Sequence, residues 1–249
     1  MSPRVVAVVQ ARMGSTRLPG KTLLRLAGAT VLEHVVNRAR SARRVDRVVV
    51  ATSTNAEDDA IVQECARLRT HVERGSALDV LDCYAMATER SGAEVVVRIT
   101  ADCPLLDPAV VDSVVEALLA APRCDYASNT LERTFPQGLD AEAVSASAMA
   151  IAACEARDPY EREHVTPYIY NRPDRFSLRN VRAAADGSDL RWTLDTPADY
   201  EYLQAVFARV DIPAKTPPPF EFVARIVRED AGLMALNARA AQATAVPAR

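Results

Sequence analysis

The sequence predicts an α/β fold built on a doubly wound, mostly parallel sheet. The first observation is an apolar, β-branched run at residues 4–10, which indicates a buried strand. The second is the return of such runs at 47–51 and 94–100, with amphipathic helical patterns between them. The third is composition: 249 residues, 49% hydrophobic and 25% charged, suffice to bury one large core.

The other elements follow in chain order. Helices are expected at 30–39, 55–68, 77–89 and 108–119, where Thr30 can cap the first and Pro108 suits the first turn of the last. Residues 73–76 are expected to form a turn. The second half predicts strands at 125–131, 139–144, 176–181 and 190–194, and helices at 145–157, 197–210 and 220–238.

Composition also bounds the function. Lys plus Arg number 30 against 33 Asp plus Glu, a net charge of −3 that gives no support for a nucleic-acid-binding surface. The five cysteines are odd in number and form no CxxC pair, which favours reduced thiols over disulfides or zinc. No apolar run has the length of a signal peptide or membrane span, so we expect a cytoplasmic protein without a membrane partner.

The loop Gln10-Ala-Arg-Met-Gly-Ser-Thr-Arg-Leu-Pro-Gly-Lys21 follows the first strand directly. It places Arg12, Arg17 and Lys21 around two glycines and two hydroxyls. Glycines let backbone N–H groups turn toward an anion and the cations neutralise phosphate, so the loop predicts a triphosphate site. A Walker A loop is disfavoured, because five residues rather than four separate Gly14 from Gly20. A plain strand-to-helix turn with solvated charges is also disfavoured, because such a turn does not need three cations beside two glycines.

This loop resembles the signature of the cytidylyltransferase superfamily, which includes the acylneuraminate and 3-deoxy-manno-octulosonate enzymes. Within this superfamily, the residues of the loop are most similar to those of the spore coat polysaccharide biosynthesis SpsF branch. The resemblance extends over residues 4–210. Five further stretches match this branch in the same order along the chain: 74–84, 98–105, 136–142, 162–168 and 194–200. The resemblance implies a nucleotide-diphospho-sugar transferase fold (GT-A-like, Rossmann-like) with a mixed-strand insertion, CTP as substrate and Mg²⁺ as cofactor.

Two aspartates supply the remaining chemistry. Asp102 and Asp195 each follow an expected strand, and carboxylates at two strand ends can converge on one site. Mg²⁺ is usually held by one or two carboxylates plus phosphate oxygens and waters, and the resemblance assigns both positions to the metal. Either Asp alone could instead cap a turn or helix. With Arg12 and Lys21 holding phosphates and stabilising the leaving pyrophosphate, these four form the expected catalytic set.

Small residues at strand ends let a planar base approach the backbone. Together with the loop they predict the nucleotide contacts, which are Gln10, Ala11, Arg12, Gly14, Ser15, Arg17, Lys21, Ala51, Thr52, Ser53, Ser76, Asp79, Thr100 and Ala101. Thr52 and Ser53 could merely cap the next helix. The acceptor is expected at Gln137, Gly138, Asp140, Arg162 and His164. His164 could help deprotonate an acceptor hydroxyl, or be structural.

The organisation expected is a nucleotidyltransferase domain over 1–212, with an insertion at about 125–185 for acceptor binding or dimerisation. A Pro-rich linker at 213–219 then leads to a C-terminal helix and tail at 220–249. We expect a homodimer that moves CMP from CTP to an acidic sugar, sugar-like or phosphonate acceptor. Two alternatives remain open: a GT-A-type glycosyltransferase in polysaccharide biosynthesis, and a non-catalytic nucleotide-binding protein. The first commonly uses an Asp-x-Asp motif, which no expected strand end carries here.

Overall fold

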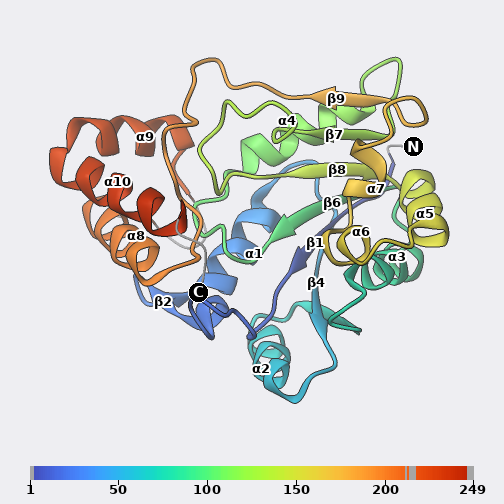
Figure 1. Ribbon diagram of the computed structural model, residues 1–249, viewed down its shortest axis with the longest axis horizontal. Coiled ribbons are helices and arrows are strands. Elements are labelled where there is room, and N and C mark those ends of the chain that lie inside the picture. The colour runs from blue at the N-terminus through green and yellow to red at the C-terminus, as the bar shows by residue number, and fades with distance from the viewer. Residues whose placement is uncertain (1–2, 211, 213–216, 246–249) are drawn as a thin grey trace.

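A seven-stranded sheet in the order β5-β4-β1-β6-β8-β7-β9 forms the centre of the molecule in the computed structural model, which describes residues 3–210, 212 and 217–245 (Figure 1). The strands are β1 (Val5–Gln10), β4 (Arg47–Ser53), β5 (His71–Gly75), β6 (Val95–Thr100), β7 (Tyr126–Ser128), β8 (Glu142–Ser145) and β9 (Leu178–Asn180). Strands β5, β4, β1 and β6 are parallel, β8 is antiparallel to β6 and β7, and β9 is parallel to β7. The predicted α/β class with a mostly parallel sheet is confirmed.

Helices cover both faces of the sheet, so β1 is buried on both sides. Val5, Ala7 and Val9 face one apolar core, whereas Val6 and Val8 face another. The first core is closed by α1 (Val31–Ser41), α2 (Asp59–Arg67) and α4 (Pro108–Leu119). The second is closed by α3 (Val80–Ser91), α5 (Ala146–Glu155) and α7 (Pro167–Tyr170).

Short elements complete the N-terminal half and the strand-rich half. They are the 3-10 helices η1 (Lys21–Leu23) and η2 (Ala56–Asp58), the hairpin of β2 (Arg25–Leu26) and β3 (Ala29–Thr30), and α6 (Pro159–His164). The predicted cap of α1 is present, since the Thr30 side chain accepts a hydrogen bond from the Glu33 amide. Helix α4 has the predicted bounds, with Asp107 capping it and Pro108 in its first turn.

One predicted turn and one predicted strand are wrong. Residues 71–75 form the edge strand β5, where a turn was expected at 73–76. Polar side chains dominate this strand because only one of its edges pairs with a neighbour, so the apolar signal of a buried strand is absent. Residues 190–194 are extended but form no named strand; one isolated bridge joins Arg191 to Gln137.

The C-terminal part contains two helices rather than the single one predicted at 220–238. They are α9 (Phe220–Glu229) and α10 (Ala231–Ala245), separated at Asp230, whose carboxylate accepts from the amides of Gly232 and Leu233. Helix α10 runs to residue 245, beyond the predicted helix end at 238, while linker residues 213–216 and the last four residues lie outside the described part.

Helices α9 and α10 lie beside α8 (Pro197–Arg209) at one side of the molecule (Figure 1). Their apolar residues share a third core with Trp192, which is fully buried. Among the described residues, no helix is both long enough and apolar enough to cross a membrane.

Candidate active site

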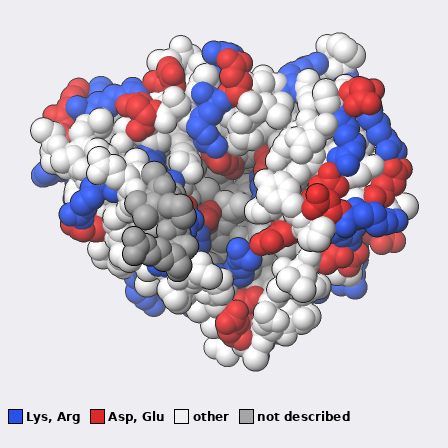
Figure 2. All heavy atoms as spheres, in the orientation of Figure 1, with Lys and Arg blue, Asp and Glu red and all other residues white. Residues whose placement is uncertain are grey.

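The strand order reverses at β1, because β4 lies on one side of it and β6 on the other. At the carboxyl end of β1, Gln10 is in register with Ala51 of β4 and Thr100 of β6. Ligands of open α/β sheets bind in the crevice at such a reversal. The loop that begins at Gln10 leaves the sheet at this point, and the face shown in Figure 2 is hollowed there.

Asp58 fixes the loop to the end of β4. Its Oδ1 accepts from the Met13 amide at 2.7 Å, and its Oδ2 accepts from the amide and the hydroxyl of Ser53. The amides of Ser15 and Gly20 both donate to Met13 O, so these two groups are used inside the loop. The positive charge offered to a ligand therefore comes from the loop's side chains rather than from these amides.

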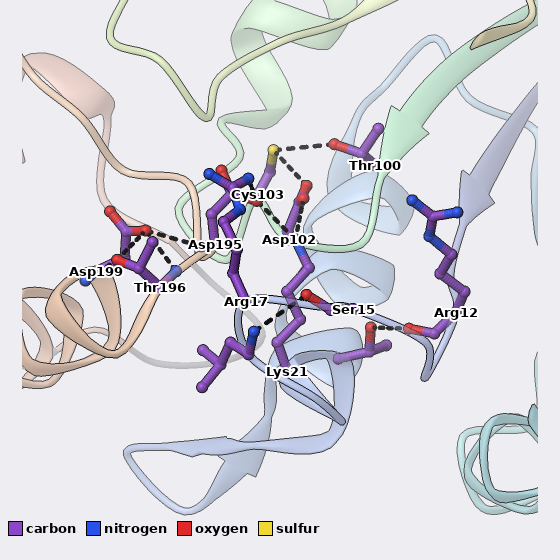
Figure 3. A network of polar contacts seen from close by, with 12 residues as sticks. Arg12, Ser15, Arg17, Lys21, Thr100, Asp102, Cys103, Asp195, Thr196 and Asp199 are labelled. Carbon is purple, nitrogen blue, oxygen red and sulfur yellow. Dashed lines mark hydrogen bonds and ion pairs between the residues drawn. The ribbon is translucent and has the colours of Figure 1, made fainter. Parts of the chain in front are cut away.

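Lys21 lies at the centre of the cleft and bridges the two aspartates that the sequence singled out (Figure 3). Its Nζ is 2.6 Å from Asp102 Oδ2 and 2.9 Å from Asp195 Oδ1. Arg17 also approaches Asp195 Oδ1, at 3.3 Å. The side chains of Lys21, Asp102 and Asp195 keep 12%, 22% and 17% of their exposure, so the cluster is shielded but open to a ligand.

The charges of this cluster shift its proton affinities. Burial alone would lower the pKa of Lys21, but the charges of Asp102 and Asp195 outweigh it and raise that pKa. Burial would raise the pKa of Asp102, yet the Lys21 ammonium outweighs it and holds that pKa below its usual range. Burial raises the pKa of the neighbouring Cys103 well above its usual value, which favours the inert buried thiol expected there.

Asp195 is held from behind by an arginine and a second carboxylate. Arg191 donates through Nη2 to Asp195 Oδ2 and through Nε to Asp199 Oδ1, each at 2.8 Å. Asp199 Oδ2 accepts from the amides of Asp195 and Thr196, and Thr196 forms a capping box at the start of α8. The expected helix start at Thr196 is therefore present, and Asp195 is left with Oδ1 facing the cleft.

The β4 side of the cleft is a pocket of small residues. Its lining is Gln10, Ala11, Arg12, Gly14, Ala51, Thr52, Ser53, Asn55, Glu57, Asp58, Ser76, Ala77, Val80 and Cys83. Thr52 Oγ1 is buried and has no hydrogen-bond partner among the described residues, whereas the Ser53 hydroxyl is bound to Asp58. The small side chains of this pocket therefore leave room for a planar group beside the strand ends.

A central hollow joins this pocket to a second one on the β8 side. The hollow is lined by Gln10, Arg12, Gly14, Ser15, Thr16, Arg17, Lys21, Thr22, Arg98, Thr100, Ala101, Asp102, Glu163, His164 and Asp195. It shares three residues with the second pocket, whose lining is Arg98, Thr100, Thr130, Leu131, Asp140, Glu142, Tyr160, His164, Thr166 and Tyr170. One continuous cleft therefore runs along the carboxyl edge of β4, β1 and β6 and under β8.

A buried ion pair forms the junction between the hollow and the second pocket. Arg98 Nη1 pairs with Glu142 Oε1, and Glu142 Oε2 accepts from the hydroxyls of Tyr126 and Thr166, each at 2.6 Å. Burial alone would lower the pKa of Arg98, but the Glu142 charge outweighs it, and the pKa is raised. The pair is thus charged, and both oxygens of Glu142 are engaged, whereas Arg98 Nε is buried without a hydrogen-bond partner among the described residues.

The predicted acceptor residues separate into three groups. Asp140 and His164 line the second pocket, where Asp140 pairs with Arg133 at 2.6 Å. Arg162 instead forms two hydrogen bonds with Asp79, at 2.9 and 2.7 Å. This pair ties α6 to the start of α3, because Asp79 also caps that helix.

The other two predicted acceptor residues, Gln137 and Gly138, lie against the chain that precedes Asp195. Gln137 O accepts from the Trp192 amide at 2.6 Å. At Gly138 φ is 107°, and an added Cβ would lie 2.5 Å from the Trp192 carbonyl carbon. Neither residue lines the pockets described above.

Several residues of the cleft escaped the sequence analysis. Arg98 had a visible signal, since it interrupts an otherwise apolar strand. Asp58 and Arg191 had none, because their partners lie on other elements. Glu163 contacts Arg12 at 3.3 Å, with both side chains about half exposed, and Tyr160 stacks on His164 with ring centroids 4.3 Å apart.

The cytidylyltransferase family model matches residues 6–225 of this chain. The chain is a member of the cytidylyltransferase family. Among curated members it is similar to the spore coat polysaccharide biosynthesis protein SpsF of Bacillus subtilis, at 33% identity over 82% of this chain and 87% of SpsF. The predicted superfamily and SpsF-like branch are thereby confirmed.

Solved structures agree with this membership. A cytidylyltransferase from Leptospira borgpetersenii serovar Hardjo-bovis superposes with a TM-score of 0.87 at 30% identity, over 94% of this chain and 97% of that one. A CMP:2-keto-3-deoxy-manno-octonic acid synthetase complexed with CTP shares the fold, with a TM-score of 0.63 at 19% identity over 82% and 98% of the two chains. The nucleotidyltransferase fold expected from the sequence is confirmed.

Proposed function

We propose that this cytidylyltransferase is Mg²⁺-dependent and transfers CMP from CTP to an acidic sugar, sugar-like or phosphonate acceptor, with release of pyrophosphate. The observation that carries the proposal is the position of Asp102, Asp195 and Lys21. The three lie between the pocket of small residues at β4 and the hydroxyl-rich pocket under β8. Two substrates placed in these pockets would meet at the cluster.

The nucleotide would lie with its base in the β4 pocket and its phosphates in the central hollow. Ala11, Ala51 and Thr52 have small side chains that allow close approach of a flat base. Arg12 and Arg17 line the hollow with side chains that are 57% and 37% exposed, so both remain accessible to phosphate oxygens. Phosphates bound there would compete with Glu163 for Arg12.

Asp102 and Asp195 suit a Mg²⁺ ion. Each presents one oxygen to the same ammonium nitrogen, so both oxygens already face a single cation position. No cluster of three or more His, Cys, Asp or Glu residues suited to a metal occurs in the described ranges, so phosphate oxygens and water would complete the coordination. Bound there, Mg²⁺ would act as a Lewis acid on the α-phosphate and orient the acceptor oxygen.

The chain's own groups then bind, orient and neutralise. Lys21, drawn from the aspartates by the phosphates, would stabilise the charge that develops on pyrophosphate as the acceptor oxygen attacks in line. No side chain needs to act as a covalent nucleophile. His164 borders both the hollow and the acceptor pocket, a position from which it could take the acceptor proton.

The acceptor class rests on the relatives together with the pocket under β8. The synthetase solved with CTP acts, by its name, on an acidic eight-carbon sugar, and SpsF is named for spore coat polysaccharide biosynthesis. Five hydroxyl side chains line the pocket here, which suits a polyhydroxylated molecule: Thr100, Thr130, Tyr160, Thr166 and Tyr170. Of the open alternatives, the glycosyltransferase gains no support from the matches above.

The test is incubation of the pure protein with CTP, Mg²⁺ and a panel of acidic sugars and phosphonates, with pyrophosphate release as readout. We expect release with at least one acceptor and none without Mg²⁺. CTP binding without turnover, unaffected by Asp102→Ala, would instead establish the non-catalytic alternative. A thermal-shift comparison of the four nucleoside triphosphates, each with Mg²⁺, tests the preference for CTP.

We also propose a cytoplasmic homodimer that associates through residues 125–185. Leu131 and Tyr160 support this, since both are large side chains of that region and are 40% and 55% exposed. Light scattering of the full chain and of Leu131→Glu would test it, with loss of the dimer expected in the variant.

A further inference from the structure

Helix α10 reaches the chain segment that carries Asp195. Asn237, on the inward face of this helix, is only 4% exposed. Its Oδ1 accepts from the Arg191 amide at 2.8 Å, and its Nδ2 donates to Asp189 O at 3.0 Å. One side chain thus satisfies two backbone groups of a segment that is not a strand.

That segment is held by few other backbone contacts. On one side, Leu190 O accepts from the Gln137 amide at 2.9 Å and the Trp192 amide donates to Gln137 O, and further along Leu194 donates to Asp102 O at 2.8 Å. On the other side no strand runs beside it in the described part of the chain, and Asn237 occupies the place of the missing ladder partner. On this side the backbone of residues 189–191 is therefore held by α10 through Asn237.

The same segment sets the geometry of the cation position. Arg191 occupies Asp195 Oδ2 and leaves Oδ1 toward Lys21, so a shift of the Arg191 backbone would turn the Asp195 carboxylate. Such supporting contacts control how well a site holds its metal. Helix α10 begins at residue 231, beyond residue 225 where the family match ends. The support is thus additional to the matched domain.

We infer that Asn237 is a positioning residue: it anchors residues 189–191 so that Asp195 presents Oδ1 to the metal and phosphates. This inference rests on the proposed function for the role of Asp195, but the contact itself does not. The C-terminal helix thereby supports the active site in addition to packing against the third core.

The test compares Asn237→Leu with Leu233→Ala in the full chain. Asn237→Leu keeps the volume and removes both hydrogen bonds. Leu233→Ala, also on α10, removes buried apolar contact within the third core but takes no hydrogen bond from residues 189–195. A third variant, Asn237→Asp, keeps the acceptor for the Arg191 amide. Thermal denaturation of each variant measures how much stability is lost.

Two readouts separate positioning from general destabilisation. One is Mn²⁺ affinity of the CTP complex by electron paramagnetic resonance, which needs no acceptor. The other is amide hydrogen exchange of the peptide covering 189–196. We expect Asn237→Leu to weaken Mn²⁺ binding about tenfold, with Asn237→Asp intermediate, and Leu233→Ala to leave it within about twofold. Exchange in the peptide should rise in Asn237→Leu, rise less in Asn237→Asp, and stay unchanged in Leu233→Ala.

The inference is overturned if Asn237→Leu binds Mn²⁺ as the wild type does, or if Leu233→Ala weakens binding equally at a similar loss of melting temperature. Failure of the proposed function gives a different result, in which the wild-type protein binds neither CTP nor Mn²⁺. Hydrogen exchange then decides alone whether Asn237 anchors the segment. Unchanged exchange in Asn237→Leu overturns the inference in that case too.

Discussion

Replacement of Lys21 by methionine tests whether its ammonium occupies the cation position of the site. The variant keeps most of the side-chain length but removes the charge that lies 2.6 Å from Asp102 and 2.9 Å from Asp195. Asp195 keeps Arg17 and Arg191 as partners. Asp102 has no other ion pair among the described contacts, so it loses the charge that holds its pKa low.

The expected cost follows from burial. Removing one partner of a buried ion pair costs about 3–5 kcal/mol, whereas a solvent-exposed pair is worth about 0–1 kcal/mol. Because Lys21 and Asp102 keep 12% and 22% of their side-chain exposure, we expect a loss nearer the buried case, about 2–4 kcal/mol by the same principle. The matched control is Arg12→Met in the same loop, whose pair with Glu163 is half exposed and should cost less than about 1 kcal/mol.

The assay is urea unfolding of the wild type and both variants, without nucleotide, with and without Mg²⁺. In the wild type Lys21 competes with the metal, so we expect little stabilisation by Mg²⁺. In Lys21→Met the two carboxylates are open to it, and Mg²⁺ at ten times its Kd should restore about 1.4 kcal/mol. Equal stability of Lys21→Met and Arg12→Met, or no response of Lys21→Met to Mg²⁺, would refute the assignment of Lys21 to the cation position.

Three further predictions follow from the surrounding structure. Gly138→Ala should lower the free energy of unfolding by about 3 kcal/mol or more in urea titration, since positive φ and a close backbone contact combine; an unchanged midpoint would contradict this. Asp58→Ala removes the carboxylate that joins the Met13 amide of the loop to the Ser53 amide at the end of β4. We expect it to raise the KM for CTP several-fold in steady-state kinetics, with kcat less affected. Asp102 has a lowered pKa, so its contribution to stability is present above the usual Asp range and is lost as pH falls through the folded value. Lys21 has a raised pKa, so its contribution is present below the ordinary value of 10.5 and is lost as pH rises through the folded value; unfolding against pH should show both losses, and neither in Lys21→Met.

The parts of the fold that the sequence predicted correctly are those governed by local signals. Strand β1 is buried on both faces and has a continuous apolar run, and α4 has both a cap and a proline at its start. Strand β5 was missed because an edge strand needs no apolar pattern. The extended segment at 190–194 has a strand's composition, but its neighbours are a helix side chain and one bridge rather than a ladder.

The site shows the same division. The sequence singled out Lys21, Asp102 and Asp195, and the structure brings them together because strand ends and one loop meet at the reversal of strand order. Asp79 and Arg162 were assigned to different substrates, yet they bind each other. Such pairings between elements depend on three-dimensional packing, and the spacing of residues along the sequence does not predict them.

The two sides of the cleft are built on strands that run in different directions. The pocket proposed for the nucleotide lies at parallel strands joined through helices, whereas the pocket proposed for the acceptor lies under β8, which runs antiparallel to β6. For the proposed reaction, this division makes the two specificities independently evolvable. Substitutions at Thr130, Tyr160 or Tyr170 can change the acceptor while the nucleotide pocket keeps its shape.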